Sequence, residues 1–361
     1  MDVTKILAFA VERGASDVHL SAGEPPIVRI HGDIKRLDQP PLSREVAHAM
    51  TFDVMNDEQR RAFDEKHDID FSYELGDIAR FRVNVFLTRR GAAAVFRVIP
   101  SAIVTLDQLG LPPVLKEICR RERGLVLVTG PTGCGKSTTL AAMIHHINET
   151  EEATIITIED PIEFVHQSKR SLINQREVGV HTKSFANALR GALREDPDVI
   201  LLGEMRDLET IALALTAAET GQLVFATLHT SSAPKSVDRV IDAFPTEQQN
   251  QVRTMFAESL QAIITQSLCK KVGAGRIAAC EILIGVPAVR NLIREGKIHQ
   301  IPSTMQTGQK LGMQTLDMAL QDLLARGLIN REEAQQKSSN PAFFGAAPVA
   351  TNLIHTSRPA N

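Results

Sequence analysis

The chain has 361 residues, of which 43% are hydrophobic and 23% charged, the balance of an ordinary globular protein with room for about two domains. Its 40 Lys and Arg against 43 Asp and Glu give a net charge of -3, which argues against a nucleic-acid partner bound mainly through phosphate neutralisation. No apolar run reaches the roughly 18 residues of a membrane span, and no secretion leader is recognisable, so we predict a cytoplasmic protein.

The first hundred residues predict a small domain that contains both helix and sheet. Residues 3–15 have the spacing of an amphipathic helix, and short β-like runs follow at 27–30 and 68–73. Apolar and polar residues alternate most clearly in 79–87, and the run 92–99 follows across a short loop that contains glycine. This arrangement is typical of a β-hairpin.

The loop of this hairpin determines which residues face each other. If Thr88–Gly91 forms the loop, Arg82 lies directly opposite Arg97 on one face of the sheet. Like charges in that position are destabilising, so an anionic group should compensate them. Two candidates stay open. One is a nearby Asp or Glu. The other is a phosphate group of a bound nucleotide, because a guanidinium group can bind two phosphate oxygens at once.

The sequence pattern changes near residue 99. Beyond a connector at 100–112, apolar runs alternate with helical segments, which predicts a mainly parallel sheet with helical crossovers. The last stretch, 340–361, has one charged residue among Pro, Ala, Ser and Asn and is predicted to be disordered. We therefore predict domains at 1–99 and 113–339, joined by the linker.

The strongest chemical signal is a phosphate-binding loop with the spacing GxxxxGKS, placed between an apolar strand and a helix. Glycines let backbone N–H groups close around phosphate oxygens, and the helix N-terminus adds about half a positive charge. Lys136 is expected to reach the β- and γ-phosphates of ATP, and the Ser137 hydroxyl to ligate Mg²⁺. The nucleotide-binding candidates are Gly130, Thr132, Gly133, Cys134, Gly135, Lys136, Ser137 and Thr138.

Cys134 places a thiol inside this loop. Lys136 and a helix N-terminus are both close to it in the sequence, and both lower the pKa of a thiol. We expect Cys134 to alkylate readily unless ATP covers it; the alternative is a small residue that the loop tolerates.

Acidic residues follow two further apolar strands. Glu204 comes just after the run 199–202, and Glu159 and Glu163 follow another strand. In an open α/β sheet, residues beyond the carboxyl ends of the strands line the ligand crevice. A third strand delivers His229 to the same edge. These residues are candidates for catalysis, and solvated loop charges are the alternative.

Several segments together resemble the secretion ATPase superfamily and, within it, the retraction ATPases of type IV pili. The resemblance covers about residues 1–335. The matching segments are ASDVHLSAGEPPIVRIHGDI, GPTGCGKST, TIEDPIE, LREDPDVILLGEMRD, TGQLVFATLHT and AVRNLIRE.

This resemblance implies an α/β fold with a PAS-like N-terminal domain and a RecA-like P-loop ATPase domain. It implies a homohexameric, Mg²⁺-dependent enzyme that converts ATP to ADP and phosphate. Glu204 matches the Walker B acid, and Glu163 matches the base for the attacking water. His229 belongs to the histidine box, where this chain has Gln222 in place of the first histidine. Arg82 and Arg97 fall where the family has phosphate-sensing arginines.

The resemblance also implies a motif that couples the ATP state to retraction, for which an ordinary amphipathic helix is the alternative. Its partners would be an inner-membrane platform protein and the pilus machinery, with the motor held at the inner-membrane face through them. We expect Leu292 and Ile293 to be the buried side of the motif. The motif residues are Arg290, Asn291, Leu292, Ile293, Arg294 and Glu295.

Three other functions stay open at this stage. ATPases for pilus extension or type II secretion usually carry a four-cysteine zinc module, whereas residues 268–280 contain just Cys269 and Cys280. A RecA-like nucleic-acid translocase would need a basic channel. A scaffold gated by nucleotide would bind the pilus machinery without hydrolysing ATP.

Overall fold

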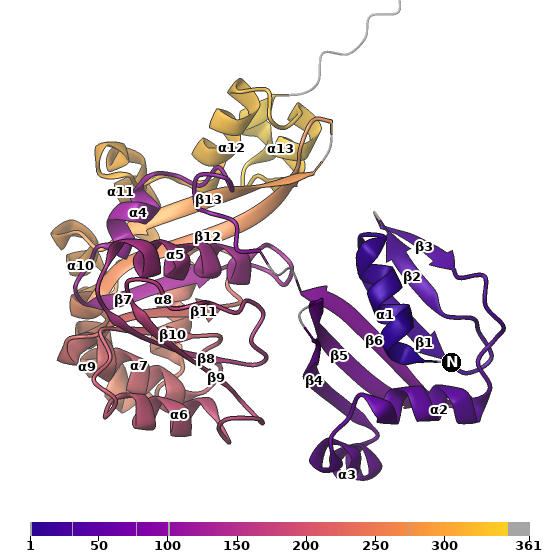
Figure 1. Ribbon diagram of the computed structural model, residues 1–361. Helices are drawn as coiled ribbons and strands as arrows, with labels where there is room; N and C mark the ends of the chain where they lie inside the picture. Colours follow the sequence, from indigo (N-terminus) through magenta and orange to yellow (C-terminus); the bar gives the residue numbers. More distant parts are fainter. Residues whose placement is uncertain (1, 31, 77, 100–101, 274, 346–361) are drawn as a thin grey trace, which may run out of the picture. The chain divides into compact units, whose positions relative to one another are not determined.

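The computed structural model describes residues 2–30, 32–76, 78–99, 102–273 and 275–345 (Figure 1). By their internal contacts the residues form two compact units, whose ranges are Met1–Val104 with Ile147–Gly203, and Thr105–His146 with Glu204–Asn361. The domain limits proposed from the sequence stay predictions.

The N-terminal part of the first unit is an antiparallel sheet of six strands in the order β3-β2-β1-β6-β5-β4. The strands are β1 (Ala15–Ser21), β2 (Ile27–Ile30), β3 (Asp33–Arg36), β4 (Asp68–Leu75), β5 (Ala79–Thr88) and β6 (Gly91–Ile99). The helices are α1 (Val3–Glu12), α2 (Arg44–Asp53) and α3 (Asp57–Lys66). Side chains of Asp2, Ser43 and Asn56 accept hydrogen bonds from first-turn N–H groups, which explains where these helices begin.

The predicted hairpin is confirmed together with its register. Thr88 pairs with Gly91 and Leu87 with Ala92, so Arg82 lies opposite Arg97. A two-residue loop leaves one way to pair the flanking strands, which is why the loop alone was enough to predict the register.

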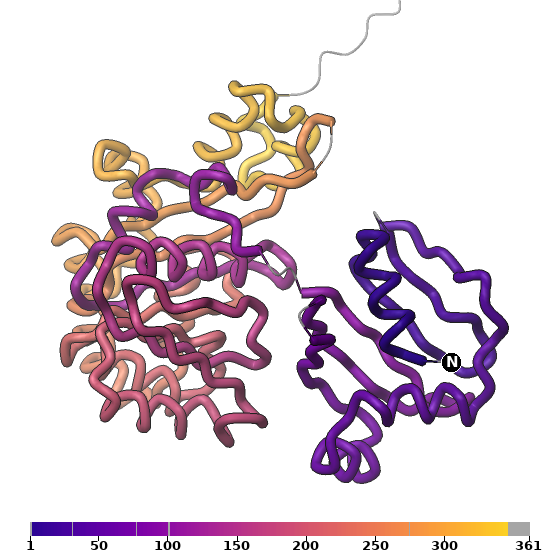
Figure 2. The backbone as a smooth tube through the Cα atoms, in the orientation of Figure 1, coloured from indigo at the N-terminus to yellow at the C-terminus, as the bar shows by residue number. Residues whose placement is uncertain are grey.

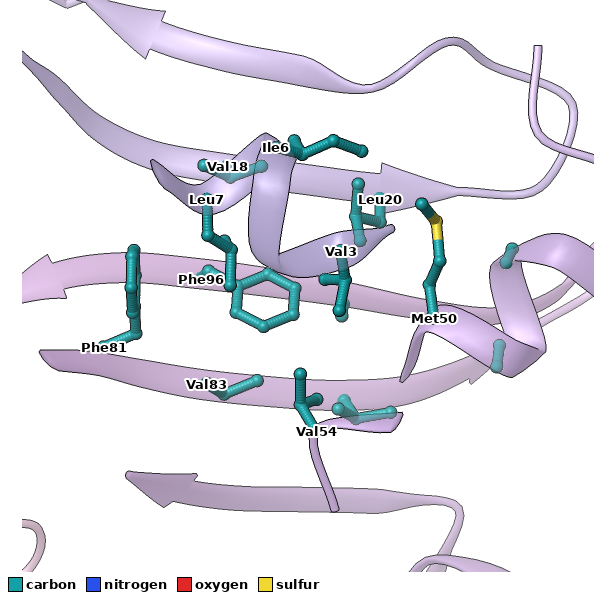
Figure 3. Packing of buried hydrophobic residues seen from close by; sticks show 14 of the residues in the cluster. Val3, Ile6, Leu7, Val18, Leu20, Met50, Val54, Phe81, Val83 and Phe96 are labelled. Atoms are coloured by element: carbon teal, nitrogen blue, oxygen red, sulfur yellow. The ribbon is translucent and has the colours of Figure 1, made fainter. Parts of the chain in front are cut away.

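The core of this sheet lies on the face that carries α1. Figure 3 shows Val3, Ile6 and Leu7 of α1 packed toward side chains of the strands. Phe81 and Phe96 meet edge to face, with their ring centroids 6.2 Å apart, and neither ring is exposed. Since residues alternate between faces along a strand, burying Phe81 and Phe96 places Arg82 and Arg97 on the other face.

The second sheet has seven strands in the order β13-β12-β7-β11-β10-β8-β9. Its strands are β7 (Gly124–Thr129), β8 (Thr154–Glu159), β9 (Leu172–Glu177), β10 (Val199–Leu202), β11 (Leu223–Leu228), β12 (Leu260–Lys270) and β13 (Arg276–Ile284). β7 pairs in parallel with β11 and β12, and β8 with β9 and β10, whereas β12 and β13 form an antiparallel hairpin. The prediction of a mainly parallel sheet is therefore confirmed.

Ten helices in the described part of the chain accompany this sheet. They are α4 (Val114–Cys119), α5 (Lys136–Thr150), α6 (Phe185–Ala192), α7 (Leu208–Thr220), α8 (Ala233–Asp242), α9 (Thr246–Ser259), α10 (Pro287–Arg294), α11 (Ile301–Thr307), α12 (Leu316–Ala325) and α13 (Arg331–Lys337). Across all the residues that the structure describes, no helix is both long and apolar enough to cross a bilayer.

The C-terminal helices α12 and α13 pack on the far end of the β12–β13 hairpin, as the chain trace shows (Figure 2). Together with the hairpin they form a small hydrophobic cluster, made of Cys269, Ile277, Ala279, Ala319, Leu320, Leu323, Ile329, Ala334 and Phe344.

The beginning of the predicted disordered tail, 340–361, is folded. Residues Pro341–Phe344 form a 3-10 turn, and Phe344 is 7% exposed within the cluster under α12 and α13. The low charge of the tail obscured this, because one aromatic side chain is enough to bind the chain to an apolar surface. Residues 346–361 lie outside the described residues, so disorder there stays a prediction.

We predict that Phe96→Ala destabilises the six-stranded sheet by about 3–5 kcal/mol, the usual effect of emptying an aromatic site in a packed core. Native-state hydrogen exchange of the β5 and β6 amides measures this free energy. Phe9→Ala is the matched control, because Phe9 is 38% exposed, and it should cost less than about 1 kcal/mol. Equal losses in the two variants would contradict the packing described above.

Candidate functional site

The GxxxxGKS loop connects β7 to α5, and its shape depends on glycine. Gly130 has a φ of 138°, and a Cβ there would lie 2.5 Å from the carbonyl oxygen of Gln266 and 2.6 Å from Sγ of Cys134. Gly133 and Gly135 have φ angles of 77° and 91°, in the left-handed region that other residues rarely adopt. The loop is thus held in the shape that lets N–H groups surround an anion.

Lys136 and Ser137 occupy the first positions of α5. The Lys136 ammonium donates hydrogen bonds to the carbonyl oxygens of Gly130, at 2.9 Å, and Pro131, at 3.1 Å, so it lies over the loop itself. Thr132 and Gly133 are exposed, while Gly135, Ser137 and Thr138 are half-buried. This set fits a nucleotide with Mg²⁺, because it supplies a cation, a hydroxyl and glycine backbone at a helix N-terminus.

Two buried polar contacts support the loop from below. The hydroxyls of Thr129 and Thr265 lie 2.8 Å apart between β7 and β12, and the Gln266 amide donates to the Thr139 hydroxyl at 2.8 Å. They fix the strand before the loop and the helix after it to the same neighbouring strand. Sequence reasoning did not identify Thr265 or Gln266, which come 136 and 127 residues after their partners.

The expectation that Cys134 has a low thiol pKa is wrong. Burial raises the pKa of this thiol, and the nearby Lys136 charge only partly opposes the effect. The side chain is 3% exposed, and a Cβ on Gly130 would lie 2.6 Å from its Sγ. Proximity in the sequence indicated the charge but not the burial, which dominates here.

Glu204 and His229 are brought together, as their strand ends predicted. Nε2 of His229 lies 3.1 Å from Oε1 of Glu204, and Nη2 of Arg206 lies 2.7 Å from Oε2. Partial burial opposes ionisation of Glu204, but the hydrogen bond and charge of Arg206, together with His229, outweigh it and hold its pKa below the ordinary value. Glu204 is therefore a carboxylate at neutral pH. Arg206, which holds it, was not among the predicted residues.

Gln222 is at the other end of the strand from His229. The six residues of β11 lie between them, and the seven steps from Gln222 to His229 span roughly 23 Å, at about 3.3 Å per residue. The Gln222 side chain accepts a hydrogen bond from the Thr220 hydroxyl at 3.0 Å. Within one chain, Gln222 therefore does not share a site with His229.

Glu159 is the last residue of β8, and Glu163 lies on the loop that follows this strand. Desolvation raises the pKa of Glu159 to about 7 from an ordinary value of 4.5, although hydrogen bonds from Thr157 and Gln175 oppose the rise. These bonds measure 2.6 Å and 3.1 Å. The backbone N–H of Glu163 also donates to Glu159, so the two acids are parts of one local network.

Glu177, at the end of β9, connects this loop to the N-terminal sheet. Its carboxylate is 2% exposed and accepts hydrogen bonds from the Ser72 hydroxyl at 2.7 Å, the Arg80 guanidinium at 2.8 Å and the Ile162 N–H at 3.1 Å. Three donors, one of them charged, stabilise a carboxylate that burial alone would disfavour. Ile162 directly precedes Glu163, so Glu177 fixes the backbone that carries it. Sequence reasoning missed Glu177.

Nearby carboxylates compensate the charges of Arg82 and Arg97. This was the first of the two candidates that the sequence of the hairpin left open. Nε of Arg97 donates to Oδ1 of Asp17 at 3.0 Å, and Nε of Arg82 lies 3.8 Å from Oδ1 of Asp70. Both arginine side chains nevertheless stay accessible, with 68% of Arg97 and 40% of Arg82 exposed. The compensation therefore leaves each guanidinium accessible to a further anion.

The motif lies in α10, with its last residue, Glu295, at the C-cap of this helix. Arg290 is a structural residue of this helix, because its guanidinium donates to three carbonyl oxygens at the junctions of α9, β12 and β13: those of Gly285, Glu258 and Leu260, at 2.7, 2.8 and 3.1 Å.

The remaining residues of α10 divide between the core and the surface. Ile293 is fully buried and Leu292 half-buried, so the expected apolar side is right for Ile293 and only partial for Leu292. Asn291 donates to Glu295 at 2.8 Å on the exposed side. Arg294 is 3.9 Å from Glu258 and also exposed.

A family model for type II/IV secretion system proteins matches residues 1–281. The chain belongs to this family. It is 60% identical over 344 residues to the type IV pilus retraction ATPase PilT of Pseudomonas aeruginosa, covering 95% of this chain and 100% of that protein. It is 60% identical over 316 residues to a twitching motility protein of Neisseria gonorrhoeae, covering 87% and 84%.

Among solved structures, the pilus retraction motor PilT with bound ADP matches at a TM-score of 0.89 and 50% identity, covering 95% of this chain and 98% of that one. These matches confirm three predictions for this secretion-family chain. It resembles the retraction ATPases, it has the α/β fold with N-terminal and ATPase domains, and it is a nucleotide-using ATPase.

We predict that Glu159 makes the protein less stable as pH rises from 4.5 to 7. Above 4.5 the unfolded chain releases the proton of this carboxyl group, whereas native Glu159 keeps it until about 7, so unfolding is favoured. Glu159→Gln should remove this fall in the free energy of unfolding, measured by urea denaturation at several pH values. Glu247→Gln, on the exposed first turn of α9, is the control and should keep the dependence of the parent.

Proposed function

We propose that this chain is a motor that hydrolyses ATP to power retraction of type IV pili. The observation that carries the proposal is the phosphate loop, with Lys136 and Ser137 at the start of α5, in a chain that matches PilT over nearly its whole length. The loop supplies the means to bind ATP, and the match supplies the process in which hydrolysis is used.

Binding of ATP follows from the loop. N–H groups of the loop and the Lys136 ammonium contact the phosphate oxygens, with phosphate replacing the carbonyl partners that Lys136 has in the loop. Ser137 would hold Mg²⁺, which when bound neutralises phosphate charge. Glu204, kept ionised by Arg206, supplies the carboxylate of the Walker B position.

Hydrolysis requires a group that orients water and positive charge for the γ-phosphoryl group. We assign the first role to Glu163, whose backbone is fixed by the network of Glu159 and Glu177. We assign the second role to Arg82 and Arg97, because exposed guanidinium groups with fixed charge suit phosphate oxygens. Stabilising charge that develops in the transition state is usually the largest contribution to such a reaction.

Motion follows from assembly and coupling. We place the chain in a cytoplasmic homohexamer at the inner-membrane face, bound there through a platform protein of the pilus machine. The exposed residues of α10, Asn291 and Arg294, are the assigned coupling surface, whereas Arg290 and Ile293 maintain the helix. The relatives named for pilus retraction and twitching motility support this process.

We predict that Glu204→Gln lowers the rate of ATP hydrolysis at least about 100-fold, because a neutral amide cannot replace the carboxylate at the Walker B position. A phosphate-release assay on the assembled protein measures this rate, and a fluorescent ATP analogue shows that binding persists. Glu219→Gln, on the exposed surface of α7, is the matched control and should hydrolyse ATP at the parental rate. Normal hydrolysis by Glu204→Gln would contradict the role of this carboxylate, and normal twitching without hydrolysis would point to a scaffold instead.

We predict that Arg294→Ala hydrolyses ATP within about twofold of the parent rate but fails to restore twitching to cells that lack the protein. The reason is that Arg294 is exposed on α10 and its ion pair with Glu258 is too long and exposed to contribute much stability. Arg326→Ala, which removes an exposed arginine at the C-cap of α12, is the control and should restore twitching. Restored twitching by Arg294→Ala would remove this residue from the coupling surface.

A further inference from the structure

A row of polar residues crosses five strands of the N-terminal sheet. Strand register pairs Ser72 with Arg82, Arg82 with Arg97, Arg97 with Asp17, and Asp17 with Arg29. Directly paired residues project from the same face, so all five belong to the face opposite the hydrophobic core. The row contains three guanidinium groups and one carboxylate, and Asp17 is that carboxylate.

Asp17 is the buried member of this row. It is 7% exposed, and its Oδ1 accepts the hydrogen bond from Nε of Arg97 at 3.0 Å. Its Oδ2 accepts from the Ser16 hydroxyl at 2.9 Å and lies 3.8 Å from Nε of Arg29. Burial opposes ionisation of Asp17, but the hydrogen bonds of Arg97 and Ser16 outweigh it and lower the pKa of the carboxyl group.

The pair formed by Asp17 and Arg97 is asymmetric. The carboxylate is buried, yet 68% of the Arg97 side chain is exposed. Burying a carboxylate costs free energy, and water screens its attraction to a guanidinium that is mostly exposed, so stability alone is a poor reason to bury Asp17. The hydrogen bond is donated by Nε, and the terminal amino groups lie beyond it on the guanidinium. An arginine held in this way has a fixed direction and keeps its terminal N–H groups for two oxygens of another anion.

We propose that Asp17 is a positioning residue, which holds Arg97 in the orientation where its terminal amino groups bind nucleotide phosphate. This inference rests on the role proposed above for Arg97. Arg82 provides the contrast within the same row. Its nearest carboxylate, on Asp70, lies 3.8 Å from Nε and is itself 51% exposed, so Arg82 is held less firmly.

The test compares Asp17→Ala and Asp17→Asn in the full chain, with kcat and KM for ATP as readouts. Misdirecting a catalytic cation typically costs about 10- to 100-fold in rate, so we expect kcat of Asp17→Ala to fall by about that factor, with KM within about threefold. Asp17→Asn keeps an oxygen acceptor for Nε and should retain much more activity. Asp70→Ala is the matched control and should change kcat less than about threefold, since the contact between Asp70 and Arg82 is long and exposed and holds Arg82 only weakly.

A double-mutant cycle separates positioning from a general structural effect. In an Arg97→Ala background, Asp17→Ala should lower kcat by less than about twofold, because the group that it positions is gone. A full additional loss there, or undiminished activity of Asp17→Ala alone, would overturn the inference. If Asp17→Ala does not fold, the same cycle with Asp17→Val, which also removes the acceptor and suits a β-strand, decides the question. If Arg97→Ala hydrolyses ATP normally, the proposed role of Arg97 itself fails, which is a different outcome from failure of Asp17 alone.

Discussion

Arg82 and Arg97 face each other across the β5–β6 hairpin, and the need to compensate these two like charges governs the polar face of the N-terminal sheet. Asp17 compensates the charge of Arg97 through a short contact, and Asp70 compensates that of Arg82 through a longer one. Because neither carboxylate covers its arginine, the compensation makes the pair tolerable and leaves both guanidinium groups able to bind an anion. The same contacts thus balance the charges of the sheet and leave the two guanidinium groups accessible to an anion.

Buried polar side chains also fix more accessible residues elsewhere in the chain; we call these buried side chains anchors. Glu177 is buried, but its donors fix the backbone next to Glu163 and connect it to β4 and β5. Beneath the phosphate loop, a pair of threonines and the Gln266 amide fix the segments on either side of the glycines. Each anchor restricts the motion of a group to which we assign a role in ATP binding or hydrolysis, and preorganised groups need less reorganisation during a reaction.

The sequence predicted what local spacing controls, and it missed what distant packing controls. The short loop at Thr88–Gly91 was enough for the facing arginines, and GxxxxGKS was enough for the phosphate loop, because each is decided within a few residues. Burial of Cys134 comes from packing that includes parts of the chain far away in sequence, such as Cys280, so its thiol pKa was predicted in the wrong direction. Glu177 lies on a strand with no strong pattern and meets Ser72 across 105 residues, which no spacing rule reaches.

The most direct test of the account follows labelled pili on living cells while the cells are depleted of this protein. If this protein drives retraction, its depletion should let pili continue to lengthen but stop them from shortening. The number of pili on the surface should then rise, and twitching should be lost. Re-supplying the parent chain should restore shortening. Pili that stop lengthening and disappear on depletion would show that the chain drives assembly, and would contradict the function proposed here.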